Sequence, residues 1–349
     1  MFDTVLHALA TAAASLVCVP VVVRVMAGSQ VLDIPNQRSS HSMPVPLGGG
    51  IGMLVPCLVG MIILWVTGGL PLTGFPAALA LGITGMAVIG FVDDLRDLPP
   101  RPRLLMEGAL VAACLAIGGL RFESLAVPGF EIGLGWEGWL VAWLFVVGFT
   151  NMFNFMDGIN GIAGFQTLIG AGGIAALGVI SNDQPLALTM ALLAGSAIGF
   201  LQYNFPRASV FMGDVGSLPI GFALAMGVLR LHSGHDGTGM PLWLPILTIW
   251  PFLFDASYTL INRVIRKRNP FRAHREHVYQ RLVVAGASHT RVTLIYAVFM
   301  LLCTGAALLA HSRPDWGGYL FWLVFLTFLI WTISTMSRIR AFRTNGEGR

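Results

Sequence analysis

The segment NMFNFMDGINGIAG, residues 151–164, places three asparagines, one aspartate and three glycines between two long apolar runs. Turn chemistry would explain it in a soluble protein, but here both flanks are almost uninterrupted hydrocarbon. The whole chain of 349 residues is 55% hydrophobic and only 11% charged. A soluble protein could not cover so much apolar surface, whereas lipid can. The sequence therefore predicts an all-α polytopic membrane protein.

A membrane-spanning helix needs about 20 mainly apolar residues, and the chain contains about eleven such runs. They centre near residues 15, 57, 83, 112, 145, 170, 194, 222, 252, 300 and 326. Lys and Arg gather in the loops at about 28–47, 93–103, 151–158, 204–214 and 263–291 and in the tail 337–349. The positive-inside rule makes these loops cytoplasmic, with the N-terminus outside and the C-terminus inside. We expect one integral membrane domain, 1–349.

Other features of the chain narrow this expectation. The first ten residues lack the basic region of a cleaved signal peptide, so we expect a retained first span. The four cysteines lie in apolar runs without disulfide or metal-motif spacing and are expected to act as small hydrophobic residues. The longest outside connection, 121–137, alternates as a short hairpin does. No internal repeat typical of transporters is visible.

Adjacent carboxylates, Asp93 and Asp94, stand at the predicted end of the third span, in FVDDLRDLPPRPR (91–103). A helix C-terminus is electronegative and neighbouring carboxylates repel each other, so a bare loop has little reason to place them there. A divalent cation or a proton-transfer role would supply the reason.

Within the opening segment, Asn154, Asp157 and Asn160 recur every three residues and would share one face if the segment were helical. Their donors and acceptors suit a ribose, a diphosphate or a hydrated metal. Helix capping is the simpler interpretation, but it requires one such residue rather than three.

Two further loops add polar groups on the same side of the membrane. Asp214, in NFPRASVFMGDVGS (204–217), is predicted at the start of a span, either as a cap or as a ligand. Phe211 of this loop fits an interfacial aromatic residue. In the loop before PLGGG (46–50), Arg38 and His41 are candidate anion contacts. The glycines permit close packing or close approach of a ligand.

The loop 263–282 is rich in Arg, Lys and His. The positive-inside rule or binding to anionic lipid headgroups explains the Arg and Lys residues, but His274 and His277 contribute little to membrane topology. With Arg275, they are predicted to contact phosphate oxygens. Zinc is not expected, because no cysteine is near and the acids favour a hard cation. Asp255 lies inside a predicted span, where a functional role and a structural one are both open.

Carboxylates from three loops, joined by the histidine loop, are thus predicted to gather at one membrane face. This set fits a multiply charged anion with Mg²⁺, or Mn²⁺ in its place. The apolar body suits a partner that lives in the lipid, and no nucleic-acid partner is expected. The combination predicts phosphoryl chemistry between a water-soluble nucleotide and a lipid phosphate.

Five motifs carry a resemblance to a known family: PLGGG (46–50), FVDD (91–94), NFMDGINGIAG (154–164), Asn204 followed by FMGDVGS (211–217), and the loop histidines. From about Asn36 to Arg281 the chain resembles the polyprenyl-phosphate sugar-1-phosphate transferases. The resemblance implies transfer of a sugar 1-phosphate from a UDP-sugar to undecaprenyl phosphate, with release of UMP.

The resemblance also implies roles for individual residues. Asp214 would be the magnesium ligand, and Phe211 would stack on the uracil beside Asn204. The expected catalytic residues are Asp93, Asp94, Asp157 and His277. The expected substrate-binding residues are Arg38, His41, Asn154, Asn160, Asn204, Phe211, His274 and Arg275.

Two departures from the family pattern bear on the substrate. Asn160 stands where many members have a second Asp, and Tyr279 and Gln280 replace further histidines. They favour the branch that initiates O-antigen and lipopolysaccharide synthesis, with GlcNAc, GalNAc or a 6-deoxy amino sugar as the donor sugar. The alternatives are the phospho-N-acetylmuramoyl-pentapeptide transferase reaction and an anionic-lipid transporter. A homodimer is compatible with the sequence.

Overall fold

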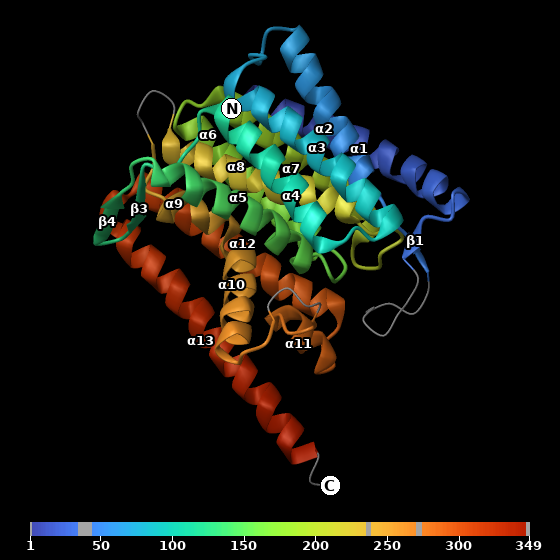
Figure 1. The fold of residues 1–349 in the computed structure, drawn as a ribbon, viewed down its shortest axis with the longest axis vertical. Coiled ribbons are helices and arrows are strands. Elements are labelled where there is room, and N and C mark those ends of the chain that lie inside the picture. Colours follow the sequence, from blue (N-terminus) through green and yellow to red (C-terminus); the bar gives the residue numbers. More distant parts are fainter. Residues whose placement is uncertain (1, 34–43, 235–238, 270–273, 347–349) are drawn as a thin grey trace.

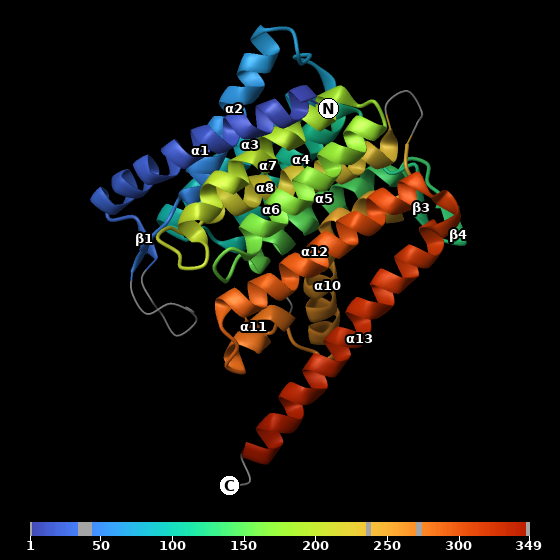
Figure 2. The same ribbon diagram turned by 180° about the vertical axis from the view of Figure 1, so that it is seen from behind.

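The computed structural model describes residues 2–33, 44–234, 239–269 and 274–346, with side chains as far as Ile339. Within this part of the chain, ten helices are long and apolar enough to cross a membrane. They pack side by side into one bundle (Figures 1 and 2). The predicted all-α polytopic architecture is confirmed.

The elements follow the predicted order closely. The candidate spans are α1 (Phe2–Gly28), α2 (Gly49–Val66), α3 (Gly74–Arg96), α5 (Glu137–Met156), α6 (Ile162–Ile180), α7 (Gln184–Asn204), α8 (Asp214–Ser233), α9–η1–α10 (Trp243–Ile246, Leu247–Ile249 and Trp250–Ile265), α12 (His289–Ser312) and α13 (Pro314–Gly346). An eleventh run forms α4 (Pro100–Gly118), a 19-residue helix that carries Arg101, Arg103 and Glu107 in its first half. The short helix α11 (Val278–Val284) precedes α12.

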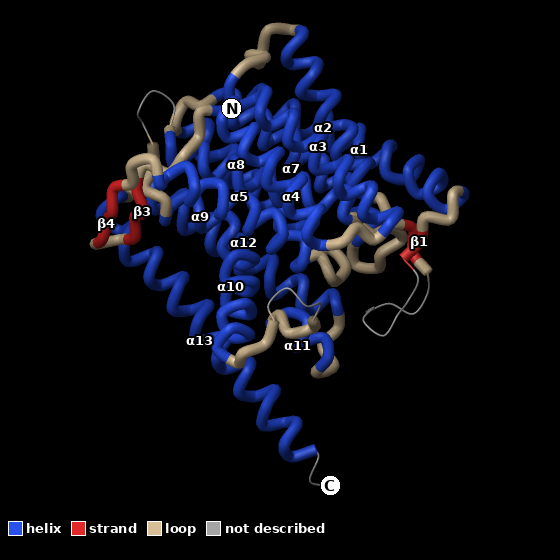
Figure 3. The backbone as a smooth tube through the Cα atoms, in the orientation of Figure 1, coloured by secondary structure: helices blue, strands red, loops and turns tan. Residues whose placement is uncertain are grey.

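Strands occur only in connections between helices (Figure 3). β1 (Leu32–Asp33) pairs with β2 (Val45–Pro46) on the α1–α2 connection. β3 (Ser124–Val127) pairs antiparallel with β4 (Phe130–Gly133), which confirms the predicted hairpin. Both views place β1 and α11 on one side of the bundle and β3–β4 on the other (Figures 1 and 2).

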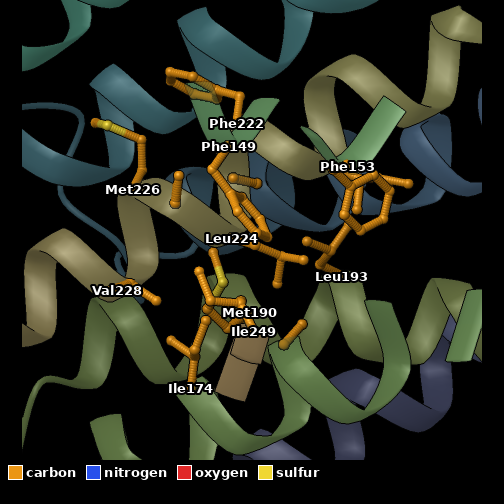
Figure 4. Packing of buried hydrophobic residues seen from close by; sticks show 14 of the residues in the cluster. Phe149, Phe153, Ile174, Met190, Leu193, Phe222, Leu224, Met226, Val228 and Ile249 are labelled. Atoms are coloured by element: carbon orange, nitrogen blue, oxygen red, sulfur yellow. The ribbon is translucent and has the colours of Figure 1, made fainter. Parts of the chain in front are cut away.

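Helix α8 forms the centre of the bundle. Of its most apolar stretch, 94% of the residues are buried, against 22% for α1 and α13. It packs against α2, α3, α5 and α6, and its side chains interleave with those of α5, α6 and α7 (Figure 4). A helix that is apolar all round is buried by its neighbours. Because helices surround α8, its position in the bundle is fixed, and so is the position of its first residue, Asp214.

Helix ends decide where the polar segments lie. Asp93 and Asp94 lie in the last turn of α3, at the end of the third span as predicted, and Asn154 lies in the last turn of α5. Helix α5 ends at Met156 and α6 begins at Ile162, so Asn154, Asp157 and Asn160 do not share one helical face, and that prediction was wrong. Gly161 has a φ of 81°, a left-handed backbone conformation that interrupts a helix at this point.

Candidate active site

The site forms where the C-termini of α3 and α5 meet the N-terminus of α8. Glycines bring these backbones into contact. A Cβ on Gly90 of α3 would lie 2.1 Å from the carbonyl oxygen of Asp214, and one on Gly50 of α2 would lie 2.2 Å from the Cα of Gly216. No other residue type fits at such distances.

The PLGGG segment is joined to the FMGD loop by backbone hydrogen bonds. The N–H of Gly49 donates to the Phe211 carbonyl (2.8 Å), and that of Gly50 donates to Met212 (2.9 Å). The N–H of Phe211 donates in turn to Pro46 (2.9 Å). Two of the motifs that carried the family resemblance therefore form one structural unit.

Asp94 receives the first backbone N–H groups of α8. Its Oδ1 accepts from Asp214 N (2.9 Å) and its Oδ2 accepts from Val215 N (3.0 Å). A carboxylate is favourable at the positive end of a helix dipole, and here it satisfies two N–H groups that have no partner within the helix. A Cβ on Gly213 would lie 2.7 Å from Asp94 Oδ2, so the contact depends on glycine. The geometry thus gives Asp94 the position of a cap for α8.

Arg103 of α4 lies between the two acids that were expected to act in catalysis and metal binding. Its NH1 is 2.5 Å from Asp93 Oδ2 and 3.2 Å from Asp214 Oδ2. Its NH2 donates to Asn151 Oδ1 (3.2 Å), and its Nε lies 3.4 Å from Glu107 Oε1. One guanidinium therefore bridges α3, α4, α5 and α8.

A side-chain network continues from this point. The Nδ2 of Asn154 donates to Asp214 Oδ1 (2.7 Å) and to Ser217 Oγ (2.8 Å). On the other side, Asn151 Nδ2 donates to Glu107 Oε2 (2.5 Å), and Glu107 is fully buried. We refer to Asp93, Arg103, Glu107, Asn151, Asn154, Asp214 and Ser217 as the Arg103 cluster.

Asp157 follows the end of α5. Its carboxylate makes no hydrogen bond or ion pair with any residue that the structure describes. Burial, followed by repulsion from the nearby Asp94 carboxylate, raises the pKa of Asp157 to about 7. Among the described residues, this carboxyl group therefore has no hydrogen-bond or ion-pair partner.

The remaining residues expected to contact the nucleotide are engaged within the protein. The Asn204 side chain accepts from Gly161 N (2.6 Å) and donates to the Val210 carbonyl (2.8 Å), which fixes the two loops together. Asn160 Nδ2 donates to the Pro206 carbonyl (3.1 Å). The Phe211 side chain is half-buried at the same end of the bundle. The structure thus gives Asn204 and Asn160 roles in loop architecture.

The histidine loop packs beside the end of α5. Tyr279 Oη donates to the Phe155 carbonyl (3.0 Å), and a Cβ on Gly158 would lie 2.2 Å from this hydroxyl oxygen. His277 is buried, and its ring centroid lies 5.9 Å from that of Tyr279.

The ring centroid of the half-buried His274 lies 5.1 Å from that of His277. Burial, then the charges of His277 and Arg263, lower the pKa of His274 to about 4. Arg275 lies between these histidines in sequence and is half-buried.

Sequence reasoning missed four members of the Arg103 cluster: Arg103, Glu107, Asn151 and Ser217. A signal existed for the first two, because Arg103 and Glu107 are four residues apart at the start of a helix that follows the acidic pair. Arg38 and His41 lie outside the described residues.

The donor set of the site suits a hard cation. Asp93 and Asp214 offer carboxylate oxygens that meet at one guanidinium nitrogen. Among the described residues, no group of three or more His, Cys, Asp or Glu side chains could hold a metal by itself. Mg²⁺ commonly takes only one or two protein carboxylates and completes its shell with substrate phosphates and water. The residues present fit that mode of binding.

Comparisons with known proteins place the chain in a family. A model of glycosyl transferase family 4 matches residues 76–232, the segment that contains the whole Arg103 cluster and Asp157. A probable undecaprenyl-phosphate N-acetylglucosaminyl 1-phosphate transferase of Bacillus subtilis is 28% identical over 86% of this chain and 83% of its own length.

Two other relatives are slightly more similar in identity. A decaprenyl-phosphate N-acetylglucosaminephosphotransferase of Mycobacterium tuberculosis is 30% identical over 80% of this chain and 76% of its own length. A phospho-N-acetylmuramoyl-pentapeptide-transferase of Heliobacterium modesticaldum is 31% identical over 74% of this chain and 83% of its own length. The chain therefore belongs to glycosyl transferase family 4 and is a polyprenyl-phosphate sugar-1-phosphate transferase.

Proposed function

We propose that this enzyme transfers N-acetylglucosamine 1-phosphate from UDP-N-acetylglucosamine to undecaprenyl phosphate, releasing UMP at the cytoplasmic face of a bacterial inner membrane. The observation that carries the proposal is the meeting of Asp93, Asn154 and Asp214 around Arg103 at the end of a lipid-embedded bundle. The relatives named for N-acetylglucosamine transfer support the choice of sugar. The Lys and Arg content of the loops at this end supports the cytoplasmic orientation.

The site has the charges that a transfer between two phosphates requires. An oxygen of the lipid phosphate attacks the β-phosphorus of the donor and forms a new P–O bond. The bond to the bridging oxygen breaks, and UMP leaves with that electron pair. Because the barrier is mainly electrostatic, fixed cations beside the diphosphate supply most of the catalysis. Arg103 is a fixed cation at the centre of the site.

Mg²⁺ completes this proposal. Asp214, with Asp93 beside it, would hold the ion, and the ion would neutralise charge on the diphosphate. Asn154 keeps one oxygen of Asp214 oriented through its 2.7 Å hydrogen bond. Arg103 would retain Asp93 and stay near the phosphates.

Direct attack by the lipid phosphate is the route we favour, and a covalent phosphosugar on Asp93 is the alternative. Asp93 Oδ2 is bound to Arg103 and Oδ1 accepts from Leu98 N (2.7 Å), so both of its oxygens are engaged. These bonds make Asp93 a weaker nucleophile. A donor with a chiral β-phosphorus separates the routes, because one displacement inverts its configuration and two displacements retain it.

The competing function within the family is phospho-N-acetylmuramoyl-pentapeptide transfer. The relative from Heliobacterium modesticaldum, which is named for this reaction, is 31% identical to the chain, so sequence identity alone does not separate the two functions. Against it stands Tyr279, which replaces a loop histidine of the family pattern and fills the space beside Gly158.

A product assay tests the proposal. Purified protein in detergent, with labelled UDP-N-acetylglucosamine, undecaprenyl phosphate and Mg²⁺, should form a lipid-linked sugar diphosphate and equimolar UMP. Product formation without a sealed membrane excludes pure lipid transport. A folded protein that forms no lipid-linked product from this donor would contradict the proposal.

A further inference from the structure

Asp255 has no role in the transfer described above, although it is the most completely enclosed acid near the histidine loop. It lies on α10, and its exposed fraction is 0%. A buried carboxylate is costly unless every oxygen is hydrogen-bonded. The question is therefore which groups satisfy this carboxylate and what they hold in place.

Four hydrogen bonds converge on this carboxylate. Oδ1 accepts from the backbone N–H of Val278 (2.9 Å) and from Thr259 Oγ1 (3.2 Å). Oδ2 accepts from the backbone N–H of Tyr279 (3.2 Å) and from Tyr296 Oη (2.5 Å). We refer to these five residues as the Asp255 cluster. The acid joins α10 to α12 and to the first turn of α11.

His277 stands immediately before α11, and its ring lies next to the same carboxylate. Its Nδ1 lies 3.5 Å from Asp255 Oδ1, and its side chain is 2% exposed. With Nδ1 toward the acid, the other ring nitrogen, Nε2, lies on the far side of the ring. This contact is a close approach without a hydrogen bond, and it favours the ring orientation that keeps Nδ1 beside the acid.

The orientation of α11 links this ring to the transfer site. Tyr279, which Asp255 holds through its N–H group, donates its hydroxyl to Phe155 beside Asp157. Its ring and that of His277 are nearly parallel, with an angle of 23° between their planes. One buried acid therefore sets the position of Tyr279 against the end of α5, and the His277 ring lies beside that tyrosine.

The loop around His277 has a second and independent support. Glu276 Oε1 lies 2.5 Å from Arg263 NH1 and 3.0 Å from Arg268 NH1, and Oε2 lies 3.4 Å from Arg281 NH2. These ion pairs hold the loop without using His277 or Asp255. A change at His277 should therefore remove the imidazole without releasing the loop.

We propose that Asp255 is a positioning residue for the transfer reaction, which fixes the ring of His277 beside the substrate diphosphate through its contact to Nδ1 and its hydrogen bonds to α11. The inference rests on the proposed function, because it assumes that His277 faces the transferred group. Asp255 acts through His277 and does not touch the substrate.

A double-mutant cycle tests this assignment. UMP release is measured for purified wild type, Asp255→Asn, His277→Asn and the double variant, using a donor that the wild type turns over. Each single change should lower kcat about 100-fold and leave the donor KM within about threefold. The double variant should be no slower than either single variant by more than about threefold, because both changes remove the same oriented imidazole.

Asp183 provides a matched control for structural damage. It is also a buried acid that caps a helix, with Oδ1 accepting from Leu186 N (3.2 Å) and Oδ2 lying 2.6 Å from Arg230 Nε. It lies at the opposite end of the bundle, on the connection between α6 and α7. Asp183→Asn should lower the Tm while kcat stays within about twofold, because no site residue depends on it.

Three results would overturn the inference. They are a folded Asp255→Asn variant with wild-type kcat, a double variant whose loss in kcat equals the product of the two single losses, or an Asp183→Asn variant as impaired in kcat as Asp255→Asn.

If Asp255→Asn does not fold, Tyr296→Phe replaces it in the cycle, since it removes one of the four hydrogen bonds to Asp255. It should slow the wild type about fivefold and leave His277→Asn unchanged. Equal slowing in both backgrounds would contradict the assignment. A wild type that turns over no donor would instead refute the proposed function.

Discussion

The Arg103 cluster and the Asp255 cluster both enclose carboxylates near one end of the bundle, but they satisfy them with different partners. Asp93 and Asp214 share a guanidinium, and Asp214 also accepts from the Asn154 amide. Asp255 is held partly by backbone N–H groups of α11. Side-chain partners can exchange when a substrate or a cation arrives, whereas backbone partners are released only if the helix moves. The first cluster is suited to rearrange and the second to stay fixed.

The largest effect should come from the acids that share Arg103. Asp93→Asn and Asp214→Asn keep the shape of each side chain but remove the charge that a cation would need. We expect each to reduce transfer by about 1,000-fold or more, which is the scale of losing a main electrostatic contact. UMP release measures the loss, and size-exclusion chromatography checks that the variants fold. Near-normal release from a folded variant would show that the cluster is not the transfer site.

Substitutions at Arg103 should have the second-largest effect on the transfer rate. Arg103→Gln leaves two carboxylates without their shared cation, and we expect about 100-fold slower transfer. Arg103→Lys keeps the charge but cannot contact Asp93, Asp214 and Asn151 together, so a loss of about 10-fold is expected. Rates measured at saturating donor separate these values. Equal rates for the Gln and Lys variants would mean that the charge of Arg103 does not matter.

Glycine packing tests whether the site depends on a fixed α8. Gly90→Ala would place a Cβ 2.1 Å from the Asp214 carbonyl, so α3 and α8 must separate. We expect a destabilisation of about 1–3 kcal/mol, seen as a lower Tm. Gly172→Ala in α6 is the control, because a Cβ there meets no atom within 4 Å. If both variants melt alike, close packing at Gly90 is not what positions Asp214.

The sequence was sufficient for the all-α architecture, because ten of the eleven predicted spans correspond to helical segments long and apolar enough to cross a membrane, and hydrocarbon length is a strong constraint in lipid. It also indicated that Asp93, Asn154 and Asp214 would lie at one end of the bundle. It could not show that Asn151 and Glu107 meet Arg103, since that contact depends on how α4 and α5 pack. The predicted helical face through Asn160 was wrong, because α5 ends at Met156, before Asp157 and Asn160, and α6 begins only at Ile162.

The role of Asp94 was also hidden from the sequence. Adjacent acids look equivalent along the chain, and both were expected to be catalytic. In the fold, Asp93 faces Arg103 while Asp94 faces the backbone of α8, because successive residues of a helix point in different directions. Only the position of the partner helix distinguishes the acid that meets Arg103 from the acid that caps α8.

The smallest expected effect concerns the pH dependence of stability through Asp157. Its pKa is raised to about 7, so the folded state holds this proton at pH values where the unfolded state has lost it. Stability therefore falls as the pH rises toward 7, and the full cost is present above that value. Asp157→Asn should have a higher Tm than the wild type at pH 8. The difference should shrink toward pH 5, as thermal melts at both pH values can show. A constant difference would mean that Asp157 does not titrate in this range.

The central claim is that the end of the bundle around Arg103 transfers N-acetylglucosamine 1-phosphate to a lipid phosphate. The most direct measurement is UMP release by the purified wild type and Asp214→Asn, with UDP-N-acetylglucosamine and with UDP-N-acetylmuramoyl-pentapeptide, each with and without undecaprenyl phosphate. We predict release by the wild type only, from UDP-N-acetylglucosamine, and only when the lipid phosphate is present. Release from the pentapeptide donor alone, or equal release by the Asp214→Asn protein, would contradict the account.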